Sequence, residues 1–395
     1  MTTNVSLQNQ HEQKMQLYRC SKCGYCRDAV SDELGFYHVC PVYKNLRMEQ
    51  YSGRGRTTIA LGLSEGIIQH SRPLTDVIYT CLSCGACKEI CPEKIDVCGI
   101  TRNLREEVFQ RKLQPPKIRE LQLALVKRHN LFNEEKPRST WADEFDLPQK
   151  AETLYFAGCS DSYTYPQTAK ACVRILQKAG KNIAYLGEKE WCCGAPAFWS
   201  GNNKLFEQIV RHNLAAIDSS GAKEVIVGCA VCYNMIKTNY PKFAKVPFKI
   251  SHISQFIAES IREGQIKFVK PFNRKLTYHD PCHLGREEKI YEEPRTIIKQ
   301  IPGVKFVEME RNRQAAWCCG EGVVVNALFP NLTRKISAER IEEARRAGAE
   351  AIVTCCPGCA ATLNKSAAWV KSREGIEIPV LELPVLVAEA MGLKL

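Results

Sequence analysis

Five cysteines recur in the same order in two stretches of this 395-residue sequence. Each stretch contains a Trp-Cys-Cys-Gly tetrapeptide, with one cysteine upstream of it and a Cys-x2-Cys pair downstream. Equivalent cysteines are 123 residues apart at the start (159 to 282) and 127 apart at the end (232 to 359). This regular offset indicates an internal duplication that repeats one chemistry. The ten residues are Cys159, Cys192, Cys193, Cys229, Cys232, Cys282, Cys318, Cys319, Cys356 and Cys359.

The sequence holds 21 cysteines, and their setting argues against a disulfide scaffold. The chain is long, the number is odd, and the first residues, MTTNVSLQNQHEQK, lack the apolar run of a signal peptide. No stretch of about 20 apolar residues predicts a membrane-spanning helix. We therefore expect a reducing cytoplasm, where clustered cysteines bind metal or react. The expected location is cytoplasmic, either free or held at the inner face of a membrane by a partner subunit.

Two further cysteine groups lie in the first part of the chain. The second group has the full bacterial ferredoxin spacing, whereas the first has 13 residues between Cys26 and Cys40. In two-cluster ferredoxins the fourth cysteine of each group binds the other cluster. The predicted ligands of one cubane [4Fe-4S] cluster are Cys20, Cys23, Cys26 and Cys91. Those of the other are Cys81, Cys84, Cys87 and Cys40.

A zinc ribbon is the alternative for these two groups. It explains neither the third cysteine of each group nor the proline after the fourth. Apolar residues at helical spacing, such as Ile59, Leu63 and Ile67, predict helices, and little alternates like a strand. We expect a mainly helical two-cluster ferredoxin domain over residues 1–130 and a charged linker over 131–150.

The rest of the chain predicts two α/β units, over residues 151–268 and 269–395. In each, an apolar strand precedes the first cysteine, a long helix follows the Cys-Cys-Gly, and a buried-type strand precedes the final Cys-x2-Cys. Alternating strands and helices favour a parallel sheet. The cysteines then lie at strand ends, where α/β folds bind ligands. We expect the two units to be related by a pseudo-twofold axis.

Five thiols per unit exceed the four that a cubane cluster needs, and two of them are adjacent. Such a set suits an opened or split cluster in which one thiolate bridges irons. The pattern resembles that of the CCG-domain family, although the first copy is one residue short between Gly194 and Cys229. This family includes the B and D subunits of heterodisulfide reductase and iron-sulfur subunits of glycolate, lactate and glycerol-3-phosphate dehydrogenases. A ferredoxin domain ahead of two CCG units resembles the D subunit.

The resemblance implies one noncubane [4Fe-4S] cluster per CCG unit, held by its five cysteines, beside the two cubane clusters. It implies an oxidoreductase subunit of the heterodisulfide reductase D type, whose noncubane clusters reduce a disulfide or similar thiol compound. The alternative is an electron-transfer subunit without its own substrate. It would link a flavin dehydrogenase, an electron-transfer flavoprotein or a bifurcating reductase complex to a quinone-reactive or other partner. A membrane cytochrome b subunit is a further expected partner.

The segment around Cys282 resembles the second-copy signature of this family. It implies that His279 or His283 orients a ligand or donates a proton during disulfide cleavage, while the alternative is an ordinary histidine at a strand end.

No GxGxxG follows a strand, so flavin or nicotinamide is expected on another chain. No basic run accompanies the formal charge of +12, which argues against nucleic-acid binding. Three cysteines stay outside the ligand sets: Cys98, Cys172 and Cys355.

Overall fold

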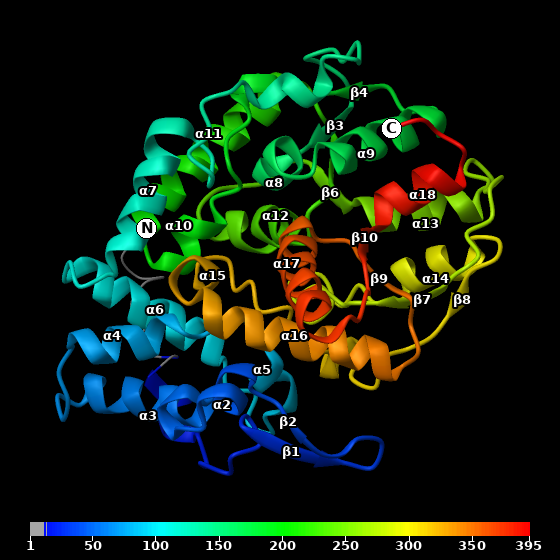
Figure 1. Cartoon of the computed structure of the whole chain (residues 1–395). Helices are drawn as coiled ribbons and strands as arrows, with labels where there is room; N and C mark the ends of the chain where they lie inside the picture. The colour runs from blue at the N-terminus through cyan, green and yellow to red at the C-terminus, as the bar shows by residue number, and fades with distance from the viewer. Residues whose placement is uncertain (1–11, 13) are drawn as a thin grey trace.

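The computed structural model of the chain describes residues 12 and 14–395. The rest of the polar start, from which the lack of a signal peptide was predicted, lies outside the described residues. In Figure 1 the first helices of the ferredoxin domain (blue) lie below two α/β units (green, and yellow to red), and its last helix (cyan) lies beside the first unit. A mainly helical ferredoxin domain followed by two α/β units is therefore confirmed. Within the described residues, no helix is both long enough and apolar enough to cross a membrane.

The ferredoxin domain is built from short helices. They are α2 (Pro41–Leu46), α3 (Gly53–Ser64), α4 (Arg72–Tyr79), α5 (Ala86–Ile90), α6 (Val97–Gln110) and α7 (Pro116–Arg128). Ser52 begins α3 by accepting a hydrogen bond from the backbone of Gly55. The helix ends before Ile67, which the apolar spacing had placed in it, because Gly66 adopts a left-handed φ of 71°.

The ferredoxin domain also contains one short hairpin, which the sequence pattern did not predict. The insertion between Cys26 and Cys40 forms an antiparallel hairpin of β1 (Asp28–Ser31) and β2 (Gly35–His38). A hydrogen bond between the side chains of Asp28 and His38 (2.5 Å) joins the two strands at their base.

The first α/β unit has a four-stranded parallel sheet in the order β4-β3-β5-β6. Its strands are β3 (Thr153–Phe156), β4 (Ile183–Ala184), β5 (Glu224–Val227) and β6 (Lys249–His252). Its helices are α8 (Gly158–Tyr163), α9 (Pro166–Lys178), α10 (Ala195–Ser200), α11 (Asn203–Ser219), α12 (Ala230–Asn234) and α13 (Ile253–Arg262).

The second unit repeats this arrangement, with a parallel sheet in the order β10-β9-β7-β8. Its strands are β7 (Lys275–Tyr278), β8 (Lys305–Phe306), β9 (Ala351–Thr354) and β10 (Val380–Glu382). Its helices are α14 (Glu292–Gln300), α15 (Val325–Leu328), α16 (Pro330–Arg346), α17 (Pro357–Glu374) and α18 (Leu383–Ala390). In both sheets the first strand of the unit is central and the second is at an edge, as a duplication requires.

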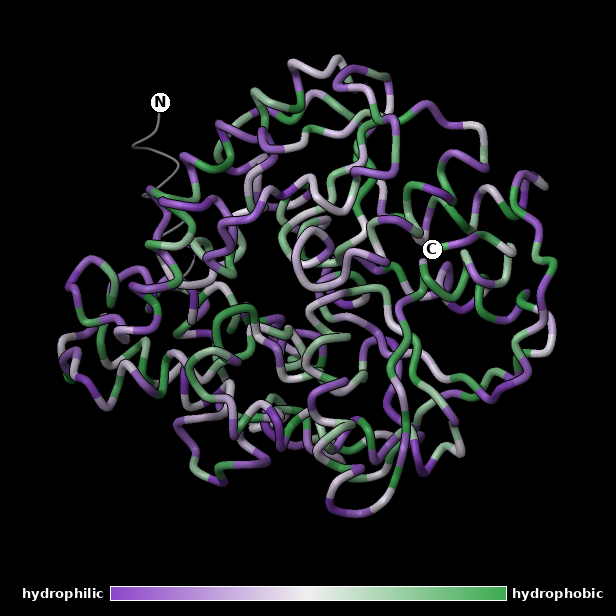
Figure 2. The backbone as a smooth tube through the Cα atoms, turned by 45° about the horizontal axis from the view of Figure 1, so that its top comes forward, coloured by the Kyte–Doolittle hydropathy of each residue, from purple (hydrophilic) through white to green (hydrophobic). Residues whose placement is uncertain are grey.

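The two units exchange their last helices. Helix α18 of the second unit packs on α9 of the first, and α13 of the first packs on α14 of the second. These two contacts are equivalent when the units are interchanged, which is the property of a twofold relationship. Along the chain, hydrophobic and hydrophilic stretches alternate (Figure 2), as expected for elements with one face in the core.

The ferredoxin domain packs tightly on the first unit through a buried arginine. Arg105 donates from Nη2 to the backbone oxygen of Cys81 (2.6 Å) and from Nη1 to that of Trp199 (2.9 Å). The hydroxyl of Tyr79 donates to the backbone oxygen of Ser200 (2.8 Å). Because these buried polar groups satisfy one another, the orientation of the two parts is fixed by hydrogen bonds as well as by apolar packing.

The segment predicted as a linker also contacts the first unit. It contains a 3-10 helix, η2 (Arg138–Ala142), in which Trp141 is buried. The indole of Trp141 donates to the hydroxyl of Tyr185 (3.2 Å). Residues 131–150 are therefore packed against this unit over part of their length, and Arg138 is carried into its interior.

Candidate metal centres

Two small cavities in the ferredoxin domain gather its cysteines. One is lined by Cys20, Cys23, Cys26 and Cys91. The other is lined by Cys40, Cys81, Cys84 and Cys87. The structure thus brings together both sets that the ferredoxin spacing predicts, with the fourth cysteine of each group in the cavity of the other. Cys87 also borders the first cavity, and Cys98 borders the second.

Gly53 lies at the start of α3, between the two cavities. A Cβ atom at this position would be 2.9 Å from Cβ of Cys26 and 3.2 Å from Cβ of Cys87. A side chain therefore does not fit here without moving one of the two cysteines. The next residue, Arg54, donates its backbone N–H to the sulfur of Cys26 (3.0 Å), a hydrogen bond that favours the thiolate form.

Six of the ten cysteines of the α/β units follow the carboxyl ends of strands β3, β5, β7 and β9. The two Cys-Cys pairs lie in the loops after β4 and β8. Their thiols form one continuous series in which each thiol shifts the pKa of the next. In order along the series they are Cys159, Cys192, Cys193, Cys232, Cys229, Cys356, Cys359, Cys319, Cys318 and Cys282. The structure thus brings together each predicted set of five.

The series has two junctions between parts of the molecule. Cys229 of the first unit interacts with Cys356 of the second, and this contact joins the two five-cysteine sets. Cys318 of the second unit interacts with Cys84 of the ferredoxin domain. The second unit therefore lies between the ferredoxin domain and the first unit in the order of sulfur contacts.

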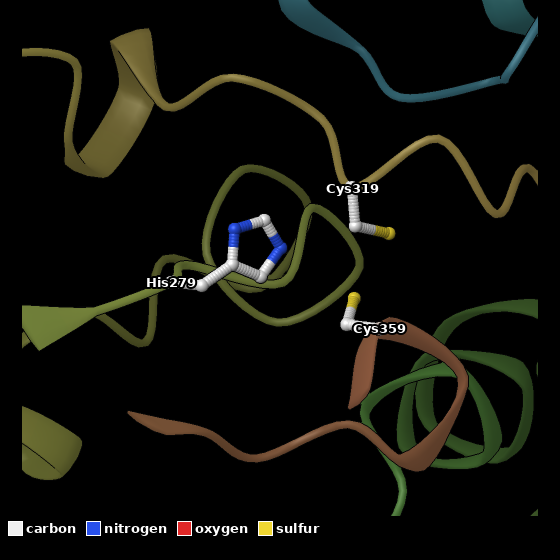
Figure 3. A group of neighbouring side chains, drawn as sticks. All are labelled: His279, Cys319 and Cys359. Atoms are coloured by element: carbon white, nitrogen blue, oxygen red, sulfur yellow. The ribbon is translucent and has the colours of Figure 1, made fainter. Parts of the chain in front are cut away.

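His279 lies beside Cys319 and Cys359 of the second set (Figure 3), and one of its ring nitrogens is within 4.8 Å of their sulfurs. Arg340 donates from Nε to its Nδ1 (3.2 Å), so Nδ1 accepts and the neutral ring carries its proton on Nε2. Nε2 has no hydrogen-bond partner within the described residues, although the side chain is buried. The ring is therefore fixed as a donor.

The first cysteine of each set has a different basic neighbour. In the first unit, Arg138 donates to the sulfur of Cys159 (3.6 Å) and to Glu190 (2.9 Å). In the second unit, Nδ1 of His283 is 3.5 Å from the sulfur of Cys282. Burial lowers the pKa of His283, but the thiolate of Cys282 outweighs this effect and raises it to about 9. The nearest basic group to the first cysteine is thus a permanent cation in the first site and a titratable histidine in the second.

Arg286 connects the ferredoxin domain to the second set. Its Nε donates to the backbone oxygen of Cys84 (2.6 Å), and its Nη1 donates to that of Ala316 (2.7 Å). The guanidinium is buried near Cys282 and Cys318, which raise its pKa even though burial alone would lower it. Its Nη2 has no partner within the described residues. One fixed positive charge therefore stands between two groups of sulfur ligands.

The three remaining cysteines have other surroundings. The sulfur of Cys355 is 2.8 Å from the hydroxyl of Tyr278, and burial raises its pKa. Burial also raises the pKa of Cys172, beside Asp161 and Tyr155. Cys98 interacts with Cys87, so it is a buried thiol close to the second cavity rather than a remote core residue.

A surface groove of about 460 Å³ passes beside the second five-cysteine set. Its walls come from the linker (Leu131, Phe132) and from α15, α16 and α17, with Glu321 and Trp369 among the lining residues. Cγ of Glu321 and the sulfur of Cys356 both lie within 4 Å of the Cβ position of Gly358. Burial raises the pKa of Glu321 to about 7. The groove thus reaches from the surface to the neighbourhood of these thiols.

The donor set fits iron-sulfur clusters. All 21 cysteines are free, so none of the ligand positions is used by a disulfide. Burial opposes ionisation of such thiols, as at Cys40, whose pKa it raises to about 12. Iron supplies the positive charge that makes a buried group of thiolates stable.

Sequence reasoning missed Arg138, Arg286, Arg340 and Gly53. Each acts through contacts with residues far away in the chain, and a single arginine or glycine carries no spacing signal. The proximity of Gly53 to Cys26 was not visible, because a glycine at the start of a helix is ordinary.

Two family models match the chain. The one described as a cysteine-rich domain matches residues 153–237 and 276–364, and the one described as a 4Fe-4S dicluster domain matches residues 16–95. The D subunit of the dihydromethanophenazine:CoB--CoM heterodisulfide reductase of Methanosarcina barkeri is 33% identical over 394 residues, which cover 96% of this chain and 95% of that protein. The chain belongs to the family of heterodisulfide reductase D subunits. The resemblance expected from the cysteine spacing is thereby confirmed.

Other relatives of this D-type chain are longer proteins that it matches in part. The EtfAB:quinone oxidoreductase of Syntrophomonas wolfei is 32% identical over 77% of the chain and 45% of that protein. The B subunit of the fumarate reductase (CoM/CoB) of Methanothermobacter marburgensis is 30% identical over 71% of the chain and 56% of that protein. A crystal structure of a hypothetical protein from Helicobacter pylori has the same fold, with a TM-score of 0.61 at 13% identity over 90% of this chain and 72% of that one.

Proposed function

We propose that the chain is an iron-sulfur oxidoreductase subunit that accepts electrons in its ferredoxin domain and uses them to reduce a disulfide or similar thiol compound. Cys20, Cys23, Cys26 and Cys91 hold one cubane [4Fe-4S] cluster, and Cys40, Cys81, Cys84 and Cys87 hold the other. The five-cysteine sets each hold a noncubane [4Fe-4S] cluster. When bound, these groups take up and release single electrons.

The observation that carries this proposal is the uninterrupted order of ligand contacts. Cys87 lines both ferredoxin cavities. Cys84 interacts with Cys318, and Cys356 interacts with Cys229. The ligand sets are thus adjacent to one another from the surface of the ferredoxin domain to the centre of the two α/β units. Stepwise electron transfer needs such an arrangement.

Reduction of a disulfide needs two electrons and two protons, which give two thiols as the sulfur–sulfur bond breaks. The two five-cysteine sets adjoin each other at Cys229 and Cys356, so a cluster held by each set would supply one of the two electrons. His279, with its donor hydrogen on Nε2, and His283 are the proposed proton donors. The groove beside Glu321 is the proposed path of the thiol compound.

A second candidate function is electron transfer without a substrate on this chain. The similarity to the EtfAB:quinone oxidoreductase favours it, because that protein contains a region like this chain within a longer sequence. The partners would then be a flavoprotein on one side and a quinone-reactive subunit on the other.

The test is metal analysis and EPR spectroscopy of anaerobically purified protein. Four clusters require about sixteen irons per chain and as many sulfides. Oxidised protein with added thiol should give a new EPR signal that disappears in Cys193→Ser. The matched control is Cys355→Ser, which keeps the signal because that thiol contacts Tyr278. Full iron content without a thiol-dependent signal would favour the second candidate function.

A further inference from the structure

The ferredoxin domain exposes one of its cluster ligands. Of the 21 cysteines, all within the described residues, Cys23 alone is exposed. The cysteines of the two α/β units are buried, apart from the half-buried Cys282. Electron transfer slows steeply with distance, so a protein that delivers electrons must bring its own cofactor close to Cys23.

The surface around Cys23 is basic. Arg19 and Lys22 are exposed beside it, and Arg54 lines the same cavity and donates to the backbone oxygen of Lys22 (2.9 Å). Glu93 lines the same cavity and Glu49 pairs with Arg54 (2.9 Å), so the exposed Arg19 and Lys22 supply the excess positive charge. The face therefore favours a partner with negative charge.

Apolar side chains adjoin this basic surface on the hairpin. Val30 and Phe36 are directly opposite in register and are 69% and 65% exposed, so they form one apolar pair on the outer side of β1 and β2. The base of the hairpin is tied to the cysteine loop, because the backbone of Arg27 donates to Gly24 (2.8 Å). Figure 1 shows the hairpin at the lower edge, away from the α/β units.

A two-stranded hairpin with an exposed aliphatic–aromatic pair has little stability of its own. Here its inner side is anchored by the buried Ala29, so the outer pair stays presented to solvent. Exposed apolar groups next to a charged rim are typical of protein interaction surfaces.

We propose that this face, made of Arg19, Lys22, Arg54, Val30 and Phe36, docks an acidic one-electron carrier protein of the ferredoxin class. The basic residues steer the carrier, the apolar pair holds it, and one electron passes from the reduced carrier to the site that includes Cys23. The carrier is oxidised by one electron and the chain is reduced by one, with no bond made or broken. This proposal rests on the proposed function, because it needs a cluster at Cys23.

The experiment measures the dissociation constant (Kd) of the anaerobic holoprotein for an oxidised plant-type [2Fe-2S] ferredoxin, whose surface is acidic. We expect Arg19→Glu/Lys22→Glu to raise Kd about tenfold at low salt, and Val30→Ser/Phe36→Ser to raise it several-fold. The wild-type Kd should also rise with ionic strength. The matched controls are Lys267→Glu and Val269→Ser, both exposed in the loop after α13, which should leave Kd unchanged.

A second readout separates docking from cluster loss. Reduction by photoreduced deazaflavin, a small neutral molecule, should proceed at the same rate in all variants, whereas reduction by the ferredoxin should slow in parallel with Kd. Equal Kd values in all variants with an intact cluster overturn the docking proposal alone. Absence of iron at Cys23 in the wild type overturns both proposals. Variants that lose binding to phosphatidylglycerol vesicles but not to ferredoxin would assign the face to a membrane and overturn the proposal.

Discussion

Arg286 donates a 2.6 Å hydrogen bond to the backbone oxygen of Cys84, which lies 202 residues away in the ferredoxin domain. The same guanidinium donates to the backbone oxygen of Ala316, two residues before Cys318. It therefore fixes the position of the ferredoxin domain against the second α/β unit at the point where their cysteines meet. It also places a permanent charge where an electron would cross.

Replacement of Arg286 should change the redox equilibrium at this junction. A cation stabilises the added negative charge of a reduced site, so Arg286→Gln should make reduction of the neighbouring sites harder. At a fixed potential we expect the ratio of reduced to oxidised sites to fall about tenfold, which is ~59 mV for one electron. Arg286→Lys should restore part of the shift. EPR redox titration is the measurement, with Arg313→Gln, a half-exposed arginine of the same unit, as the control.

Gly53→Ala should damage both ferredoxin cavities. The added methyl group would lie 2.9 Å from Cβ of Cys26 and 3.2 Å from Cβ of Cys87, which belong to different ligand sets. We expect the loss of up to eight of about sixteen irons, seen by metal analysis. Gly62→Ala in the same helix is the control, because its nearest contact is the flexible end of Ile68 at 3.3 Å. Full iron content in Gly53→Ala would contradict the assignment of both sites.

His279→Leu should alter the second five-cysteine site without unfolding the chain. It removes the Nε2 donor that lies near Cys319, together with the acceptor of Arg340. Loss of this donor beside the sulfurs should shift the site's redox equilibrium by roughly tenfold. His279→Gln keeps a donor and should shift it less. Unchanged EPR signals and potentials in both variants would mean that the ring only fills space.

His252 should make the stability of the first unit depend on pH. It is fully buried, accepts from the backbone of Ser254 and faces the backbone oxygen of Gly228, and burial lowers its pKa to about 4. Because the folded pKa lies below the unfolded value, the neutral ring stabilises the fold. This stability is complete above about pH 6.5 and is lost as the pH falls toward 4.

Between pH 7 and pH 5 we expect this residue to remove about 2 kcal/mol from the free energy of unfolding. His252→Asn keeps an acceptor at the start of α13 and should remove that part of the pH dependence. Anaerobic urea unfolding at both pH values, followed by circular dichroism, gives the difference between the two proteins. Equal pH dependence would show that another group is responsible.

The duplicated cysteine spacing made most of the architecture predictable. Strands before Cys159 and Cys282 and the long helix after each Cys-Cys-Gly lie where the apolar pattern placed them, because local sequence determines such elements. The hairpin at 28–38 was missed because its strands are only four residues long and alternate weakly around Ala29, Val30 and Phe36. A Gly at 35 next to acidic residues was the turn signal that could have found it.

The surroundings of the cysteines were less predictable than their grouping. Nothing in the sequence indicates that Arg138 contacts Cys159 or that Tyr278 contacts Cys355, because such pairs are set by the packing of whole domains. The ligand sets themselves could be anticipated, since metal chemistry constrains both the residue type and the spacing.

Arg105 and Arg286 hold the ferredoxin domain against both α/β units from buried positions. Within the described residues these contacts fix the domains relative to one another, so the proposed electron relay needs no domain movement. Solvent viscosity should therefore slow only the binding of the carrier and of the thiol compound. The rate of electron transfer inside the protein should be the same in glycerol as in buffer.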